Sequence, residues 1–124
     1  MKININVINR AIKEAKLSDV WRGKVGAVLF TNDCNIVLSS HNVTIDGNEK
    51  YTIHAEENII FKAMKQKLFD RLPNEKIYLL VLRWRKKDDT IAMSKPCERC
   101  QYWINKYKLK VYYSDDNGNI VKGF

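Results

Sequence analysis

The sequence contains His54-Ala55-Glu56 at the start of one helical pattern and Pro96-Cys97-Glu98-Arg99-Cys100 at the start of a second. Zinc prefers about four tetrahedral ligands drawn from thiolate sulfur, imidazole nitrogen and carboxylate oxygen. The two cysteines are three positions apart, so both sulfurs fall on one side of a first helical turn. The proline suits a helix start, where the helix dipole favours the thiolate form that binds metal. We therefore expect two helix N-termini to converge on one metal ion.

The number of ligands indicates which kind of metal site this is. His54, Cys97 and Cys100 supply three protein ligands, whereas a structural zinc site is closed by four. With three ligands a position stays open to water, and the metal lowers the pKa of that water to about 7. Glu56 follows the histidine by two residues and is the expected proton carrier beside that water. Thr52 is the expected N-cap of the histidine-bearing helix.

Two alternatives remain open from the residues alone. A closed structural site would recruit His41 or Cys34 as its fourth ligand, but that arrangement gives Glu56 no role. The same closed site would fit a non-catalytic, zinc-stabilised module that binds nucleic acid.

The two motif halves together resemble the cytidine deaminase superfamily, whose signature is H-x-E followed by P-C-x-x-C. That superfamily includes enzymes acting on free nucleosides, on deoxycytidylate, on tRNA adenosine and on cytosine in polynucleotides. The resemblance implies a Zn²⁺ cofactor held by His54, Cys97 and Cys100, with Glu56 as the catalytic acid and base. It also implies a hydrolase that acts on C–N bonds in cyclic amidines.

Substrate contacts are expected from two further residues. In the resembled family an asparagine leaving the second strand contacts the substrate, and Asn42 matches its position. Ala55 lies at the helix start, where its backbone N–H is available to hold the substrate. Free-nucleoside enzymes place a glutamate two residues after the asparagine, and Thr44 stands there in this sequence. His41 and Tyr51 fit either the pocket or the surface.

Composition limits the class of protein. The 124 residues are expected to form a single domain, 1–124, and no apolar run approaches the ~20 residues of a membrane span. The three cysteines form no disulfide framework, which suits a reducing, cytoplasmic compartment. Lysine and arginine number 22 against 14 acidic residues, a net charge of +8 that attracts nucleotides or nucleic acid.

Hydrophobic periodicity gives the expected fold class, which is α/β. We expect a three-layer α/β/α, cytidine deaminase-like fold, with a mixed five-stranded sheet and an antiparallel C-terminal hairpin turned by Asp116-Asn117-Gly118. Gly26 is small enough to let a helix or ligand come close. The expected helices cover residues 3–15, 53–68 and 97–108, the expected strands residues 24–30, 35–40, 77–84, 91–93, 109–113 and 119–121, and residues 45–51 are expected to form a loop.

The basic run Arg83-Trp84-Arg85-Lys86-Lys87 has two interpretations. It is either a solvated hairpin with one packed tryptophan, which we favour, or a surface that pairs phosphate with charge and stacks a base.

Taken together, the sequence predicts a zinc-dependent deaminase that converts cytosine to uracil in a (deoxy)cytidine nucleoside or nucleotide. A cytosine deaminase acting on single-stranded DNA or RNA is the alternative, ahead of a tRNA adenosine deaminase. The corresponding processes are nucleotide metabolism and nucleic acid editing. Self-association into a homo-oligomer is a further expectation.

Overall fold

The computed structural model describes residues 2–21, 23–72 and 76–123 of the chain. The helices are α1 (Ile5–Leu17), α2 (Ala55–Lys65), α3 (Leu68–Arg71) and α4 (Glu98–Lys106). The strands are β1 (Lys24–Thr31), β2 (Ile36–His41), β3 (Val43–Ile45), β4 (Asn48–Ile53), β5 (Ile77–Arg85), β6 (Thr90–Ala92), β7 (Lys110–Ser114) and β8 (Ile120–Lys122). Within the described residues, no helix is both long enough and apolar enough to cross a membrane.

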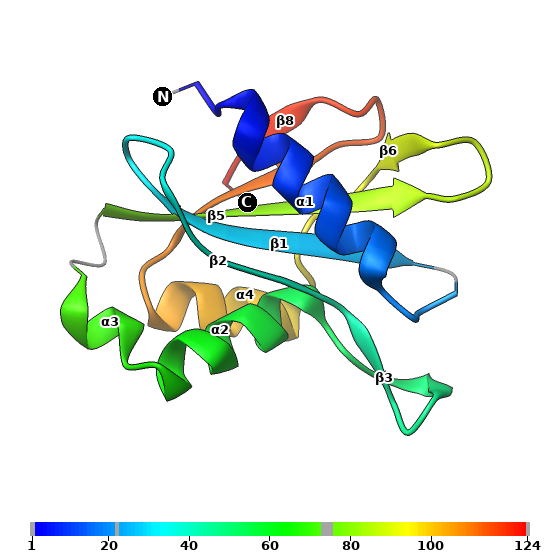
Figure 1. Cartoon of the computed structure of the whole chain (residues 1–124), viewed down its shortest axis with the longest axis horizontal. Helices are drawn as coiled ribbons and strands as arrows, with labels where there is room; N and C mark the ends of the chain where they lie inside the picture. Colours follow the sequence, from blue (N-terminus) through cyan, green and yellow to red (C-terminus); the bar gives the residue numbers. More distant parts are fainter. Residues whose placement is uncertain (1, 22, 73–75, 124) are drawn as a thin grey trace.

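A mixed sheet forms the middle of three layers, with α1 on one face and α2, α3 and α4 on the other (Figure 1). Its strand order is β2-β1-β5-β7-β8, and β1 is antiparallel to both of its neighbours. β5 lies parallel to β7, which the chain reaches through α4, so these three elements form a βαβ unit. The antiparallel β7–β8 hairpin is confirmed as well. The short β6, expected over residues 91–93, pairs with the end of β5, so the sheet has six strands and not the five expected.

The N-terminal helix packs directly against the backbone of the sheet. Val7, Ala11 and Ala15 are fully buried along one stripe of α1. Gly26 lies beneath that stripe, where an added Cβ would come within 2.0 Å of the Ala11 carbonyl oxygen and 2.8 Å of the Ala15 nitrogen. The expectation that this glycine lets a helix approach closely is therefore confirmed. A second core on the opposite face joins β1 and β5 to α2 and α4.

The segment expected to form a loop over residues 45–51 is instead part of a hairpin, and that prediction was wrong. β3 and β4 pair antiparallel across the two-residue turn Asp46–Gly47. Both turn residues have positive φ, 54° and 73°, the backbone combination that a tight Asp-Gly hairpin turn requires. Thr52 lies in β4 and is not the N-cap, because His54 itself caps α2.

The helix expected over residues 53–68 is broken near its end. α2 stops at Lys65, and Lys67 adopts the left-handed conformation with φ 55° and ψ 34°. The single turn α3 follows and ends at Arg71. Of the stretch 70–75 expected to end the helix, residues 73–75 lie outside the described part of the chain.

Candidate metal centre and active site

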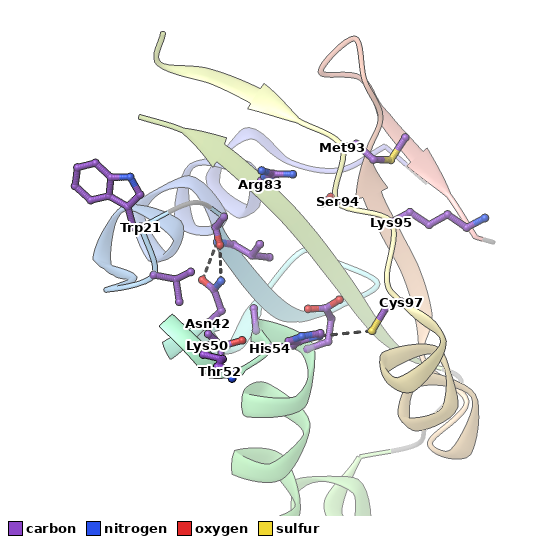
Figure 2. Close-up of a pocket in the computed structure, with 15 residues that line it drawn as sticks. Trp21, Asn42, Lys50, Thr52, His54, Arg83, Met93, Ser94, Lys95 and Cys97 are labelled. Atoms are coloured by element: carbon purple, nitrogen blue, oxygen red, sulfur yellow. Dashed lines mark hydrogen bonds between the residues drawn. The ribbon is translucent and has the colours of Figure 1, made fainter. Parts of the chain in front are cut away.

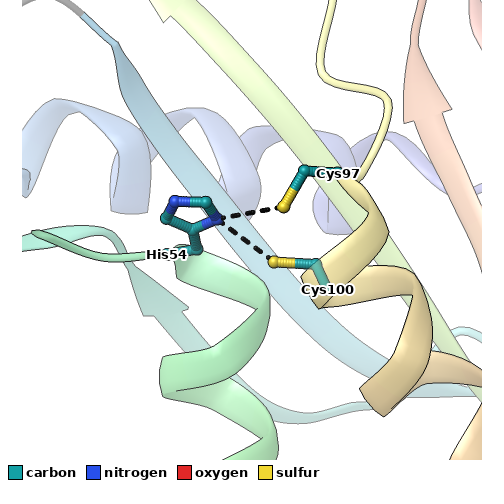
Figure 3. A group of neighbouring side chains, drawn as sticks. All are labelled: His54, Cys97 and Cys100. Atoms are coloured by element: carbon teal, nitrogen blue, oxygen red, sulfur yellow. Dashed lines mark hydrogen bonds between the residues drawn. The ribbon is translucent and has the colours of Figure 1, made fainter.

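His54 and Cys97 each occupy the N-cap of a helix, so the two helix starts face one another. The His54 Nδ1 atom lies 3.2 Å from Cys100 Sγ and 3.5 Å from Cys97 Sγ (Figure 3). The three candidate ligand atoms all lie within 4.8 Å of one another. The sequence thus places on two separate helices three side chains that the fold brings together.

This donor set suits a tetrahedral zinc ion. Zinc bonds of about 2.3 Å to sulfur and about 2.0–2.1 Å to nitrogen separate neighbouring tetrahedral ligands by about 3.5 Å, close to the observed spacing. Burial lowers the pKa of His54, and the nearby Arg99 cation lowers it further, which favours the neutral imidazole that binds metal. Burial raises the pKa of the Cys100 thiol, with the Glu56 charge adding to it, so a nearby cation is needed to favour the thiolate.

Glu56 lies in the first turn of α2 and is 6% exposed, against the wall of the cavity that opens over the candidate ligands. Burial raises the pKa of its carboxyl to about 7, while hydrogen bonds from its own backbone N–H and from Cys100 act in the opposite direction. The structure therefore places a buried carboxyl beside the three candidate ligands and open to the cavity.

A neighbouring carboxylate links the two helices that carry the candidate ligands. Glu57 Oε1 accepts hydrogen bonds from the backbone N–H of His54 at 3.3 Å and from Arg99 Nη2 at 2.8 Å. Arg99 lies between the two cysteines in the sequence, so this ion pair ties the start of α4 to the start of α2. The sequence-based prediction assigned neither residue a role. Their positions inside the two motif halves were the available signal.

The cavity over the site has a volume of about 820 Å³, which is large enough for a nucleotide. Three cationic side chains line it, Lys50, Arg83 and Lys95, whereas Glu56 is its only lining carboxylate among the described residues. Figure 2 shows Trp21 and Cys97 at opposite sides of this cavity. An anionic ligand would therefore meet net positive charge around the candidate metal centre.

The expected substrate residues Asn42 and Ala55 both line the cavity. The Asn42 side chain, however, is held by the start of β1: its Oδ1 accepts from Val25 N at 2.9 Å, and its Nδ2 donates to the Gly23 carbonyl (Figure 2). Substrate contact by either residue remains a prediction.

Thr44 and Tyr51 are not among the described residues that line the cavity. The Thr44 hydroxyl and backbone N–H both donate to Asp19, at 2.5 and 2.8 Å. This threonine therefore anchors the loop after α1, which explains its presence in structural terms.

The side chains considered for a fourth metal ligand lie elsewhere. His41 Nδ1 contacts Glu14 Oε1 at 2.8 Å, beside α1. Cys34 packs against the core on the α1 side of the sheet, and its Sγ lies 3.9 Å from the Lys2 carbonyl oxygen. Among the described residues, neither joins the cluster of His54 and the two motif cysteines.

Several cavity residues were not anticipated from the sequence, and Ser94 and Trp21 are two of them. Ser94 fixes the segment before Cys97, because its hydroxyl donates to the Val81 carbonyl and contacts the Ser114 hydroxyl, each at 2.7 Å. Trp21 is 75% exposed and follows α1 in a loop. A large aromatic side chain in a polar loop was a usable signal that the prediction overlooked.

A three-layer α/β/α fold with a histidine and two cysteines at facing helix starts defines a class of metal-dependent hydrolytic enzyme. A sequence model described as "Cytidine and deoxycytidylate deaminase zinc-binding region" matches residues 1–114. The chain therefore belongs to the cytidine and deoxycytidylate deaminase family, whose cofactor is zinc. Membership implies a zinc-dependent deaminase.

Solved structures agree on the fold. The chain is similar to cytidine deaminase from Burkholderia pseudomallei, with 20% identity and a TM-score of 0.70 over 98% of this chain and 92% of that one. It is also similar to a mutant cytidine deaminase from Mycobacterium tuberculosis, with 19% identity and a TM-score of 0.57 over 89% and 85% of the two chains. Comparison with curated protein sequences gives no match.

Proposed function

We propose that this protein hydrolytically deaminates cytosine to uracil in a cytidine or deoxycytidine nucleoside or nucleotide. The observation that carries this proposal is the meeting of His54, Cys97 and Cys100 beneath a cavity whose wall contains the buried Glu56. The family and the cytidine deaminases of similar fold support cytosine as the base.

We assign zinc binding to His54, Cys97 and Cys100. Zinc held by these three ligands would supply hydroxide at neutral pH, because the bound metal lowers the pKa of water to about 7. The two cysteine sulfurs lie at the start of α4, where the helix dipole favours the thiolate. His54 is held by the bond from its backbone N–H to Glu57, which fixes the start of α2.

Glu56 moves the protons. Its carboxylate takes a proton from the attacking water, whose oxygen forms a bond to the amine-bearing carbon of the ring. Glu56 gives that proton to the adjacent ring nitrogen, then passes the second proton of the water to the amine. The C–N bond breaks, ammonia leaves and uracil remains. The backbone N–H groups of Ala55 and Glu56 face this region from the helix start and can hold the base.

The cationic side chains of the cavity indicate whether the substrate carries a phosphate group. Lys50, Arg83 and Lys95 surround the space above the candidate metal centre, and a nucleoside alone offers them no charge. A nucleotide phosphate would pair with these positive charges, so we favour a nucleoside monophosphate as the substrate within this proposal. The three free cysteines suit a reducing compartment, and the cytoplasm is the proposed location.

The test is ammonia release from cytidine, deoxycytidine and their 5′-monophosphates by the zinc-loaded protein. We expect turnover of at least one substrate, and loss of about 10⁴-fold or more in kcat for Glu56→Ala with the zinc content unchanged. Glu98→Ala is the matched control, since it removes an exposed carboxylate from the first turn of α4. Silence toward all four compounds, or full activity of Glu56→Ala, would overturn the proposal.

A further inference from the structure

A second cavity, of about 560 Å³, shares Trp21 with the active-site cavity. We name it the tryptophan groove; its other lining residues are Lys24, Trp84, Arg85, Lys86 and Lys87. Four of these side chains are cationic, and no carboxylate is among the described residues that line the groove. The positive field of the active-site cavity thus continues beyond Trp21.

The fold holds Trp21 at the junction of the two cavities. The loop that carries it is fixed on its N-terminal side, where Ser18 Oγ donates to the Asn42 carbonyl at 2.7 Å and Asp19 accepts both hydrogen bonds from Thr44. Despite these anchors the tryptophan side chain is 75% exposed. A large, positioned and exposed indole ring is suited to stack a nucleobase.

The groove's second tryptophan has a different, structural role. Trp84 is half-buried, its Nε1 donates to Asp89 Oδ1 at 2.6 Å, and the Lys16 ammonium lies 5.1 Å from its ring centroid. The expected packed tryptophan of the β5–β6 hairpin is therefore present. Its packing fixes the hairpin that carries three of the groove's four cations, and the Lys86 ammonium lies 5.8 Å from the Trp21 ring centroid.

Two carboxylates lie in the turn of this hairpin, and both accept hydrogen bonds from neighbouring side chains. Asp88 Oδ1 accepts from the Thr90 hydroxyl at 2.6 Å, and Asp89 accepts from the Trp84 indole. Asp19 accepts from Thr44 on the other side of Trp21. None of the three lines either cavity. Lys86 and Lys87 are both exposed, so they form a cationic surface that adjoins the Trp21 ring, whereas the Lys24 ammonium donates to the Ser18 carbonyl.

We propose that the tryptophan groove binds the nucleotide adjacent to the target cytosine in single-stranded DNA or RNA. Its base stacks on Trp21, and its phosphate lies against Lys86 and Lys87. This inference rests on the proposed cytosine deamination and extends its substrate class to polynucleotides. A single nucleotide in the active-site cavity would place its phosphate near that cavity's own cations, whereas the groove lies beyond Trp21 and requires a second nucleotide.

Binding is measured first, independently of turnover. The probe is a fluorescein-labelled single-stranded hexanucleotide with one central cytosine, as DNA and as RNA, added to zinc-loaded Glu56→Gln protein. We expect Lys86→Ala/Lys87→Ala to weaken binding about tenfold at low salt and to reduce the slope of log affinity against log salt by about 1. Lys62→Ala/Lys65→Ala is the matched control, because these two lysines lie in the last turn of α2 and line neither cavity.

Stacking is tested by the pair Trp21→Leu and Trp21→Phe. Loss of the aromatic ring should weaken hexanucleotide binding about tenfold, whereas phenylalanine should retain most of it. Equal binding by the Leu and Phe variants, or equal loss in the two double-lysine variants, would overturn the groove assignment.

Turnover then separates this inference from the proposed function. For protein with Glu56 intact, Lys86→Ala/Lys87→Ala should lower the ratio of kcat/KM for the hexanucleotide to that for deoxycytidine about tenfold, and leave the ratio for deoxycytidine 5′-monophosphate to deoxycytidine unchanged. If both ratios fall together, the groove serves a mononucleotide phosphate and the inference is wrong. Turnover of deoxycytidine with no preference for the hexanucleotide would also refute it, while the proposed function stands. Silence toward every substrate would refute the proposed function, and the binding data would still decide the groove.

Discussion

The side chain of Glu57 connects the two halves of the candidate metal site through one oxygen atom. That oxygen accepts from the backbone N–H of His54 and from the Arg99 guanidinium, although Glu57 itself is only 8% exposed. A buried carboxylate that loses its cationic partner is costly, and partners outside the ligand shell also hold the ligands in position. The pair therefore bears on both stability and zinc affinity.

We expect Arg99→Ala to weaken zinc binding about tenfold and to lower the free energy of unfolding by about 1–2 kcal/mol. Competition with a chromogenic chelator gives the first value and urea unfolding of the zinc-loaded protein the second. Arg99→Lys is the control that keeps the charge. An Arg99→Ala protein with unchanged zinc affinity would show that the ion pair has no part in holding the ligands.

Glu14 provides a second test at the scale of single residues. It accepts from Ser39 Oγ at 2.7 Å and contacts His41 Nδ1 at 2.8 Å, so it ties α1 to the end of β2. Burial alone would raise the pKa of Glu14, but the hydrogen bonds from His41 and Ser39 outweigh it and hold the pKa below its ordinary value of 4.5. A lowered carboxyl pKa stabilises the fold above pH 4.5, and that contribution is lost as the pH falls through the folded-state pKa.

Glu14→Gln should therefore be less stable than the parent protein at about pH 6, with the difference shrinking below pH 4.5. Urea unfolding at a series of pH values measures this difference. Asp116→Asn, at the exposed turn before β8, is the control carboxylate. A stability difference that is independent of pH would rule out the carboxylate's charge as the source of the effect.

At the scale of elements, the packing of α1 on β1 depends on the missing side chain of Gly26. A Cβ atom there would lie 2.0 Å from the Ala11 carbonyl oxygen, and a helix backbone cannot rotate away as a side chain can. We expect Gly26→Ala to destabilise the fold by about 3 kcal/mol or more, because overpacking against rigid backbone shifts the whole helix.

Gly23→Ala is the matched control for Gly26→Ala. The nearest atom to its added Cβ is Arg83 Nε at 3.9 Å, which is an ordinary contact. Gly23→Ala should therefore change the free energy of unfolding only by lowering the conformational entropy of the unfolded chain. Thermal unfolding of the two variants measures the difference. Similar melting temperatures for both would mean that α1 does not rest on β1 as described.

The elements that the sequence predicted well are those whose pattern is set by burial. β5 is buried along most of its length and α1 along one stripe, so the apolar spacing alone located them. The β3–β4 hairpin is half-exposed, and its Asp46–Gly47 turn was interpreted as part of a loop because the residues directly after it, 48–50, are all polar. The break between α2 and α3 could not be predicted from a glycine or proline, because a lysine, Lys67, adopts the left-handed conformation there.

The residues of the candidate site also fall into two groups: those that short sequence motifs predict, and those that only long-range contacts bring into place. His54, Glu56 and the two motif cysteines were predicted as site residues because each motif half is short and chemically unusual. The role of Asn42 as a hydrogen-bond partner of Gly23 and Val25 could not be predicted, because those contacts join residues 17 and more positions apart. Trp21 likewise gains its place between two cavities only from the approach of β5 to the loop after α1.

At the scale of the whole molecule, the candidate metal centre joins α2 to α4 across the face of the sheet opposite α1. The two helices share the core formed on that face, together with β1, β5 and β7. A metal ion at their N-termini would therefore clamp distant segments of the chain, since His54 and Cys100 are 46 positions apart in the sequence. Homo-oligomer formation, expected from the sequence, remains a prediction.

Removal of zinc should therefore destabilise the entire domain. A ligand present at about 1,000 times its dissociation constant stabilises the folded state by about 4 kcal/mol, which for a domain of this size is about 10 °C or more in melting temperature. We expect a strong chelator to lower the melting temperature of the parent protein by that amount, and re-addition of zinc to restore it. Cys97→Ala should show no response to zinc, whereas Cys34→Ser should respond like the parent because Cys34 packs on the other side of the sheet. A Cys34→Ser protein that fails to bind zinc would instead support a closed four-ligand site, and would contradict the open catalytic centre from which the proposed deamination follows.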